Sequence, residues 1–389
     1  MGSREVRRNV LAVIVATAIV LPTLYGVAIL TASNTPTPGT MPIVGLPAAP
    51  VALAYDSEKG EMFVASYYAN VVRVISDTTN TVVATVGVGL GPAAVAYDSG
   101  RREVFVANYD SDTVSVISDG TNRVVATVSL LPRSGPIAMA YDSGRGEVFV
   151  AGFQSANVSI ISDRTNTVAA TVRLFGGPAP NDVAYDRGTG EIFVANSFMS
   201  ALPDNVSVIS DSTNVVVATI GVGSGPFGMV CDSGKGEVFV ANRYTENVTV
   251  LSDNSDRPVA SVSLPANSTP LAVGYDSGKG EVFVANYYPS TKSADVSVIS
   301  DATNAIVAAV PLLAGALPVG VAYDAGRGTV YVASFNSTTV TNTVSMISDS
   351  TNTVIATMDA GISHSVEAGS SNEGAYTLRP EDGAFSAHP

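Results

Sequence analysis

The stretch Pro92-Ala-Ala-Val-Ala-Tyr-Asp98 opens a unit that continues with Glu103-Val-Phe-Val-Ala-Asn108, Thr113-Val-Ser-Val-Ile-Ser-Asp119 and Arg123-Val-Val-Ala-Thr-Val128. Its four runs have the length of β-strands and are rich in Val, Ile, Phe and Thr, which pleated sheets favour. The residues between the runs include Asp, Ser, Gly and Asn, which are typical of tight turns. The unit therefore predicts four consecutive strands joined by short connections.

The same unit recurs seven times, and a Tyr-Asp pair or its variant ends the first run of each copy. Successive pairs lie 42 to 48 residues apart. Repeats of about 40–45 residues that hold four strands are typical of propeller blades. We therefore predict an all-β fold, a seven-bladed β-propeller of four-stranded antiparallel blades over residues 50–360. The pairs are Tyr55-Asp56, Tyr97-Asp98, Tyr141-Asp142, Tyr185-Asp186, Cys231-Asp232, Tyr275-Asp276 and Tyr323-Asp324.

Small residues alternate with larger ones along the first run of each copy, as at Ala94 and Ala96. Because blades converge toward the axis of a propeller, the innermost strand needs small side chains where neighbouring sheets nearly touch. We expect the first run to be innermost and the fourth to be outermost. We also expect the ring to close on its own strands, with residues 41–45 as an alternative closing strand.

The repeat resembles a known family of propeller repeats, the YVTN type. The resemblance is carried by Phe105-Val-Ala-Asn108, Val114-Ser-Val-Ile-Ser-Asp119 and Thr121-Asn-Arg-Val-Val-Ala-Thr-Val128, and it covers residues 50–360. Archaeal surface-layer propeller proteins and related bacterial periplasmic propellers carry such repeats. The resemblance implies a cell-surface or exported protein with an adhesion or envelope role. The chain departs from the repeat pattern at Cys231 and Thr329.

The N-terminus carries a targeting signal. Arg4, Arg7 and Arg8 precede an uncharged apolar run from Val10 to Leu30, which is long enough to span a bilayer as a helix. We expect residues 1–31 to form a hydrophobic helix that anchors the chain, with the N-terminus inside and the propeller outside. A cleaved signal peptide is the alternative. We interpret residues 32–49 as a Pro/Thr-rich spacer and residues 361–389 as a polar, flexible tail.

Composition excludes several classes of function. The net charge is -14, whereas a nucleic-acid partner requires a basic surface. The single cysteine, Cys231, cannot form an intrachain disulfide framework. The two histidines, His364 and His388, both lie in the tail, so the propeller has no histidine for a Ser-His-Asp triad or a typical zinc site. We expect no cofactor and no metal site.

Together these observations predict an exported propeller of the cell surface or envelope that binds, adheres or builds structure without catalysis. Its expected partners are cell-envelope proteins or glycans, and it would meet the membrane through the run from Val10 to Leu30. The alternative is an exported enzyme of the lyase or lactonase type, which would use carboxylates and a cation bound in the central channel.

The fourth copy contains the one polar interruption of a first run. Asn181 and Asp182 stand where the other copies have small or apolar residues. Asp182 could point into the central channel and contact a cation or a polar ligand. The alternative is a solvated carboxylate at the channel mouth, because unpaired carboxylates are seldom buried.

An aromatic residue follows the second run in every copy. These residues are expected on the face that holds the connections between the second and third runs and between successive blades. They could contact a glycan or a protein, or they could pack over the neighbouring blade. They are Tyr67, Tyr109, Phe153, Phe198, Tyr244, Tyr287 and Phe335.

Five Asn-x-Ser/Thr sequons are candidate N-glycosylation sites in an exported protein. Ser and Thr are abundant in the chain, so chance matches are also expected. The sequons begin at Asn157, Asn205, Asn247, Asn267 and Asn336.

Overall fold

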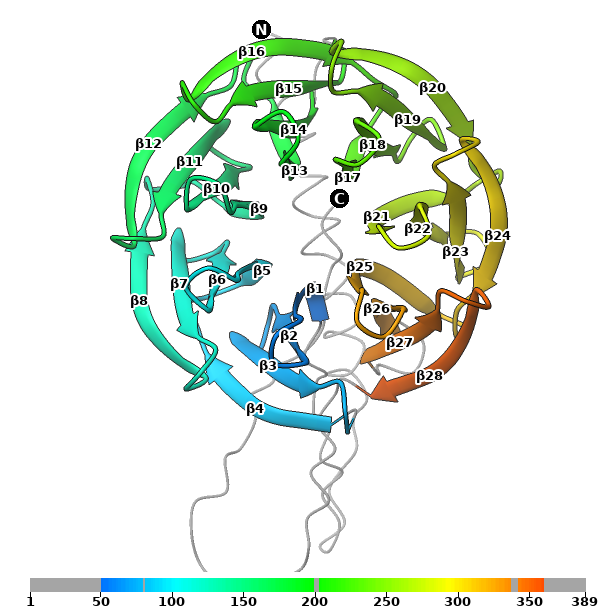
Figure 1. Ribbon diagram of the computed structural model, residues 1–389, viewed down its shortest axis with the longest axis horizontal. Coiled ribbons are helices and arrows are strands. Elements are labelled where there is room, and N and C mark those ends of the chain that lie inside the picture. The colour runs from blue at the N-terminus through cyan, green and yellow to red at the C-terminus, as the bar shows by residue number, and fades with distance from the viewer. Residues whose placement is uncertain (1–49, 80, 199–202, 337–341, 360–389) are drawn as a thin grey trace, which may run out of the picture.

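A computed structural model describes residues 50–79, 81–198, 203–336 and 342–359. Every regular element in these ranges is a β-strand, and seven four-stranded sheets stand around a central axis (Figure 1). Each sheet is antiparallel and consists of four consecutive strands. The predicted all-β, seven-bladed propeller with four-stranded antiparallel blades is therefore confirmed.

The strands run from the axis outward in each blade. Blades one to four contain β1 (Pro50–Asp56), β2 (Glu61–Ser66), β3 (Val71–Ser76), β4 (Thr81–Gly87), β5 (Pro92–Asp98), β6 (Glu103–Asn108), β7 (Thr113–Ser118), β8 (Arg123–Ser129), β9 (Pro136–Asp142), β10 (Glu147–Gly152), β11 (Asn157–Ser162), β12 (Thr167–Arg173), β13 (Ala179–Asp186), β14 (Glu191–Ser197), β15 (Asn205–Ser210) and β16 (Val215–Gly221). Blades five to seven contain β17 (Pro226–Asp232), β18 (Glu237–Asn242), β19 (Asn247–Ser252), β20 (Arg257–Ser263), β21 (Thr269–Asp276), β22 (Glu281–Tyr288), β23 (Ser293–Ser300), β24 (Ala305–Pro311), β25 (Ala316–Asp324), β26 (Thr329–Asn336), β27 (Asn342–Ser348) and β28 (Thr353–Asp359).

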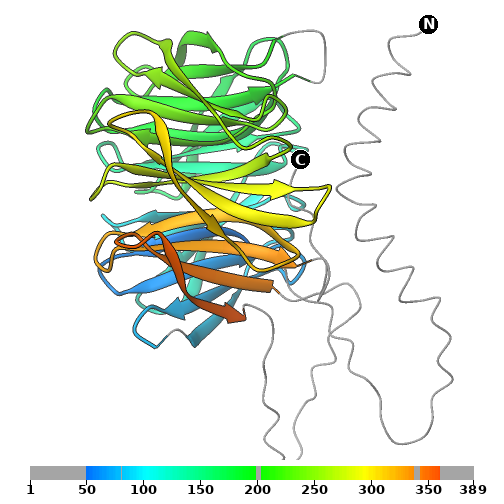
Figure 2. The ribbon, with the colours of Figure 1, turned by 90° about the vertical axis from the view of Figure 1, so that its right-hand side faces the viewer.

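The ring closes where β1 of the first blade meets β25 of the last (Figure 1). Both blades are complete from their own consecutive strands. Figure 2 shows the blades edge-on, stacked around the ring. The predicted anchor over residues 1–31, the spacer, the alternative closing strand at 41–45 and the tail lie outside the described residues. Among the described residues, no helix is long and apolar enough to cross a bilayer.

The connections between the first and second strands are built by the Asp of the Tyr-Asp pair. In the third blade, Asp142 Oδ1 accepts hydrogen bonds from the backbone N–H groups of Gly144, at 2.7 Å, and Arg145, at 3.1 Å. Gly146 then adopts a φ of +68°, a conformation that favours glycine. An Asp that bonds its own following backbone is the turn that the sequence predicted.

The core lies between neighbouring blades. A Phe in the middle of the second strand is fully buried in six blades, and Tyr331 takes its place in the seventh with 2% exposure. Valines and isoleucines of the third strands complete the same clusters. The fourth strands expose most of their side chains, so they form the rim of the disc. The predicted order, with the first strand innermost and the fourth outermost, is confirmed. The six phenylalanines are Phe63, Phe105, Phe149, Phe193, Phe239 and Phe283.

Neighbouring blades are also joined through the tyrosine of the Tyr-Asp pair. The Tyr97 hydroxyl donates to Asp119 of its own blade at 3.3 Å and also interacts with Asp56 of the preceding blade. The same type of bridge recurs at Tyr55, Tyr141, Tyr275 and Tyr323.

Cys231 breaks this series because its thiol replaces the hydroxyl. Here the carboxyl groups of Asp186 and Asp253 lie close enough to shift each other's pKa, lowering that of Asp186 and raising that of Asp253.

Candidate functional site

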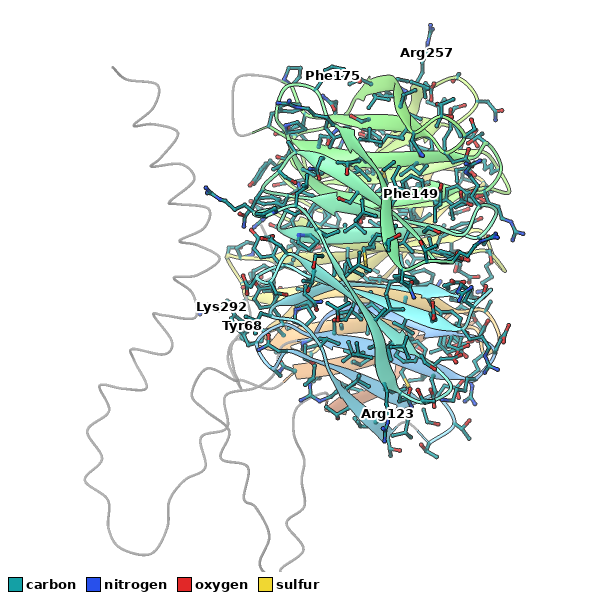
Figure 3. The ribbon with its side chains drawn as sticks, turned by 90° about the vertical axis from the view of Figure 1, so that its left-hand side faces the viewer. Tyr68, Arg123, Phe149, Phe175, Arg257 and Lys292 are labelled. Atoms are coloured by element: carbon teal, nitrogen blue, oxygen red, sulfur yellow. The ribbon has the colours of Figure 1, made fainter. Side chains whose placement is uncertain are left out.

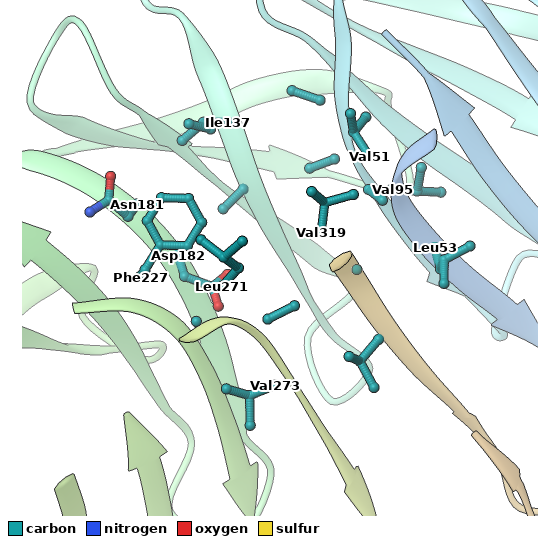
Figure 4. Close-up of a pocket in the computed structure, with 18 of the residues that line it drawn as sticks. Val51, Leu53, Val95, Ile137, Asn181, Asp182, Phe227, Leu271, Val273 and Val319 are labelled. Carbon is teal, nitrogen blue, oxygen red and sulfur yellow. The ribbon is translucent and has the colours of Figure 1, made fainter. Parts of the chain in front are cut away.

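The central channel is lined by the seven first strands and has a volume of about 190 Å³ (Figure 4). Each first strand carries a β-bulge just after its Pro, and the extra residue faces the channel. Six of these residues are apolar, and the seventh is Asn181. The side chains that line the channel are therefore mostly apolar, with a polar sector in the fourth blade. The bulge residues are Val51, Ala93, Ile137, Asn181, Phe227, Leu271 and Val319.

Both predicted polar residues lie in the channel wall and bond across the junction to the fifth blade. Asn181 Nδ2 donates to the carbonyl of Pro226 at 2.8 Å. The Asp182 carboxylate accepts from its neighbour Val183 N–H at 2.8 Å and from Met229 N–H of β17 at 2.6 Å. These bonds fix both side chains between two blades.

Burial in the apolar wall raises the pKa of Asp182 to about 7, against the lowering effect of the two N–H bonds that it accepts. The carboxyl group can therefore change charge near neutral pH. Among the described residues, no group of three His, Cys, Asp or Glu side chains could hold a metal ion. What the sector offers is two polar side chains, already bonded to backbone, beside an apolar cavity. A role for Asn181 and Asp182 as ligand contacts stays a prediction.

The channel end where the first strands begin is surrounded by the residues that follow the second strands. The backbone N–H of Tyr109 donates to Gly91 and that of Phe153 to Gly135. In the fifth blade the equivalent bond, to Gly225 at 2.7 Å, comes from Arg243. Arg243 is thus the structural counterpart of the aromatic residues, and Tyr244 is displaced by one position.

The fourth blade has the same one-residue offset. The Pro of each first strand pairs with the last residue before this position, as Pro92 pairs with Asn108 and Pro180 with Asn196. By this register Ser197 is the counterpart of Tyr109, and Phe198 follows it. Ser197 and Arg243 therefore interrupt a ring that is aromatic in the other five blades.

Four aromatic side chains of blades one to three form a continuous arc on this face. The ring centroids of Tyr67 and Tyr68 lie 5.0 Å apart, those of Tyr67 and Tyr109 6.5 Å, and those of Tyr109 and Phe153 6.4 Å. All four are half-buried, and they pack against the hydrophobic clusters beneath them. Tyr68 lies with Lys292 at the left-hand edge of the disc in Figure 3, whereas Phe149 lies inside it.

The remaining aromatic candidates differ in exposure. Phe335 is buried, with 7% exposure, and packs in the cluster of the first blade. Phe198 and Tyr287 are half-buried. Tyr244 is 63% exposed, so it is the candidate that solvent reaches most freely. Phe335 therefore packs over a neighbouring blade, whereas the Tyr244 side chain is available at the surface.

Arg243 is the functional candidate that sequence reasoning missed. Its guanidinium carbon lies 5.8 Å from the ring centroid of Phe227 and 5.7 Å from that of Tyr244. Its Nη1 atom is buried without a hydrogen-bond partner, and burial lowers the pKa of the guanidinium. The available signal was the residue directly after Asn242, the end of the fifth Phe-Val-Ala-Asn motif, where most copies have an aromatic.

The two faces of the disc differ in apolar exposure. Loops on the face of the aromatic arc carry five exposed large apolar side chains. Among the described residues, the tight turns on the opposite face carry none, and the other exposed large apolar side chains belong to the fourth strands of the rim. We call the first surface the loop face. Its five exposed side chains are Leu90 (55%), Leu131 (53%), Phe175 (82%), Tyr244 (63%) and Leu313 (50%).

The candidate glycosylation sites are not equally accessible. Asn157 is buried, with 6% exposure, whereas Asn267 is exposed in a loop. Asn205 and Asn247 are half-buried and hydrogen-bonded to side chains of their own blades. The side chain of Asn336 lies outside the described part. Asn267 therefore offers the most accessible acceptor among the four described side chains.

No protein-family model and no curated protein matches this sequence. Among solved structures, the fold is similar to hydrazine synthase from Kuenenia stuttgartiensis, with a TM-score of 0.67 and 15% identity, covering 81% of this chain and 99% of that chain. It is also similar to virginiamycin B lyase from Staphylococcus aureus, with a TM-score of 0.61 and 13% identity, covering 73% of this chain and 91% of that chain. At these identities the likeness shows the propeller fold alone.

Proposed function

We propose that this protein is an exported, non-catalytic binding propeller of the cell envelope, which contacts envelope proteins or glycans through its loop face. The observation that carries the proposal is that the loop face carries five exposed large apolar side chains, two of them aromatic, whereas the described tight turns of the opposite face carry none. Exposed aromatic side chains often anchor interfaces. The apolar run from Val10 to Leu30 and the YVTN-like repeats support export and an envelope location.

The loop face has the composition of a recognition surface. Aromatic side chains supply large contact area at low entropic cost and dominate the binding energy of many interfaces. Phe175 and Tyr244 are exposed for contact, whereas Tyr67 and Tyr109 are half-buried and support the surface from below. This division favours Phe175 and Tyr244 as direct contacts.

The alternative function is an exported enzyme of the lyase or lactonase type that uses a cation in the channel. It rests on Asp182, the one carboxylate in the channel wall within the described ranges. That carboxylate already accepts two backbone N–H bonds, so fewer of its lone pairs remain for a cation. The non-catalytic reading is therefore the one we propose.

The test is co-sedimentation of the purified full chain with envelope fragments from the organism that encodes it. We expect Leu131→Ser and Phe175→Ser to reduce binding several-fold, because each removes exposed apolar area from the loop face. The matched control is Val125→Ser on the rim, which is 55% exposed compared with 53% for Leu131. Equal binding by all variants, or recovery of the native protein in the cytosol, would contradict the proposal.

A further inference from the structure

The fifth blade places a positive charge at the mouth of the channel. Arg243 occupies the ring position that is aromatic in five other blades, and its guanidinium lies over the ring of Phe227. Phe227 is itself a bulge residue of the channel wall. Arg243 therefore lies one side chain away from the cavity, at the end that opens on the loop face.

This arginine lacks the acidic partner that the chain could readily supply. The sequence has 34 acidic residues and 20 basic ones. Several arginines in the turns form ion pairs with these acidic residues: Arg145 pairs with Glu147, and Arg327 pairs with Asp77. Within the described part of the chain, Arg243 forms no ion pair with a carboxylate. Two aromatic rings hold its guanidinium in place, and its Nη1 atom is buried without a partner.

A guanidinium without an acidic partner, packed on a wall residue of a cavity whose side chains are mostly apolar, has the chemistry of an anion site. Guanidinium groups bind carboxylates through two parallel N–H bonds. Burying a donor without a partner costs free energy, and an incoming anion would remove that cost. A position held between two rings also lowers the entropy lost on binding.

We propose that Arg243 and the central channel form a binding site for a small organic carboxylate with an apolar body. The carboxylate pairs with Arg243 at the mouth, and the apolar body enters the channel beside Phe227 and Leu271. A cavity of about 150 Å³ can hold benzene, so the channel, at about 190 Å³, accommodates a body of that size. This proposal does not rest on the envelope contact proposed above, although Arg243 packs on Tyr244 of the loop face.

The charges that face the channel fix the orientation of the ligand. Asp182 is the one ionisable residue in the channel wall among the described residues. In its ionised form Asp182 would repel an anion placed deep in the cavity beside it, and burial there disfavours a second charge. A ligand therefore gains most with its charge at Arg243 and its uncharged end in the channel.

The experiment is calorimetric titration of the full chain with benzoate, and with benzyl alcohol as a neutral ligand of similar size. We expect benzoate to bind at least about tenfold more tightly than benzyl alcohol, because a charge-assisted hydrogen bond is lost with the neutral ligand. This comparison needs no substitution. Acetate, which lacks the apolar body, is expected to bind more weakly than benzoate.

Substitutions then test whether Arg243 supplies the positive charge that binds the carboxylate. Arg243→Gln should abolish the preference for benzoate over benzyl alcohol, whereas Arg257→Gln, at an exposed arginine on β20 of the same blade, should leave it unchanged. Circular dichroism confirms that each variant is folded, and Arg243→Lys keeps the charge if the Gln variant does not fold. Benzoate that binds no better than benzyl alcohol, or equally well to a folded Arg243→Gln variant, would overturn the site. Envelope binding by the same variants reports separately on the loop face.

Discussion

At the scale of single residues, Cys231 in place of a tyrosine changes how two neighbouring carboxyl groups interact. Elsewhere a tyrosine hydroxyl stands between a turn Asp of its own blade and the Asp of the preceding blade, as Tyr97 does. With Cys231 in this place, the carboxyl groups of Asp186 and Asp253 interact with no tyrosine hydroxyl between them. Burial and the facing Asp186 carboxyl raise the pKa of Asp253 to about 6. Burial opposes a low pKa at Asp186, but hydrogen bonds from Asp253 and Ser233 outweigh it and lower the pKa.

This pair predicts a loss of stability as the pH rises from about 4 to about 6. The unfolded pKa of Asp is about 3.9, below the folded value for Asp253, so the folded protein binds more protons in that window. Stability therefore falls with rising pH there. After allowance for solvent screening, we expect this pair to lower the free energy of unfolding by about 1 kcal/mol over that pH range. Urea unfolding at pH 4.5 and pH 7 measures the total change, to which the Asp182 carboxyl, whose pKa is also raised, adds in the same direction.

The variant Cys231→Tyr isolates the contribution of the pair. It supplies the missing hydroxyl donor, so we expect the stability difference between the two pH values to shrink by about 1 kcal/mol. Cys231→Ser is the control, because its short hydroxyl replaces the thiol without the reach of a tyrosine. An identical pH profile for Cys231→Tyr and the parent would contradict this account.

At the scale of elements, the turn between the first and second strands ends in a residue with positive φ, which is glycine in six of the seven blades. Gly146 has a φ of +68°, and a Cβ added there would lie 2.5 Å from a carboxylate oxygen of Asp163. The same closeness holds in other blades, for example at Gly280. The second blade uses Arg102 at this position, with a φ of +59° and an ion pair to Asp119 at 3.1 Å. Glycine therefore lets the two tight turns of a blade pack together.

We predict that Gly146→Ala lowers the free energy of unfolding by about 1–3 kcal/mol. The substitution adds left-handed backbone strain and displaces the Asp163 carboxylate. Urea denaturation provides the measurement.

Gly221→Ala is the matched control, because Gly221 ends the outer strand β16 and a Cβ there meets nothing within 4 Å. We expect it to be neutral or slightly stabilising. Equal effects of the two alanines would show that turn packing is not the cause.

At the scale of the whole molecule, the ring must close between segments that are far apart in the sequence. The first and last blades meet at β1 and β25. Arg327 of the last blade donates to the Asp77 carbonyl at 2.9 Å, and its Nε lies 3.1 Å from the Asp77 carboxylate. Lys59 reaches the Asp119 carbonyl of the next blade at 2.7 Å, so the closing contact repeats one used within the ring.

We predict that Arg327→Ala loosens this seam. The side chain is partly exposed, so the loss should be at most about 1 kcal/mol, which corresponds to up to about fivefold faster local opening. Hydrogen exchange of the β1 and β25 amides should speed up, while β13 on the far side stays unchanged. Arg145→Ala is the control, because Arg145 has the equivalent turn position between the third and fourth blades, away from the seam. Uniform acceleration in all blades would indicate global destabilisation instead.

Much of the fold could be predicted because each blade is specified locally. Four strands and their turns fit within one repeat, and the Phe-Val-Ala-Asn motif and the Tyr-Asp pair recur with it. Because the repeat occurs seven times, the number of blades, the order of the strands and the small residues near the axis could all be predicted. Asn181 and Asp182 were also found this way, because an exception is visible against a regular repeat.

The candidate site was predicted less completely, because its members belong to different blades. Counting along the sequence gave Tyr244 the position that strand register assigns to Arg243. The sequence likewise did not show that Asp182 would bond the Met229 N–H of the next blade.

The sequence by itself thus determined the repeating blade, since strand propensity and turn chemistry act over neighbouring residues. Only the tertiary structure decided which side chains meet between blades. The placement of Arg243 over Phe227, the interaction between the Asp186 and Asp253 carboxyl groups and the closing contact of Arg327 all depend on distances set by ring closure, which no single repeat encodes.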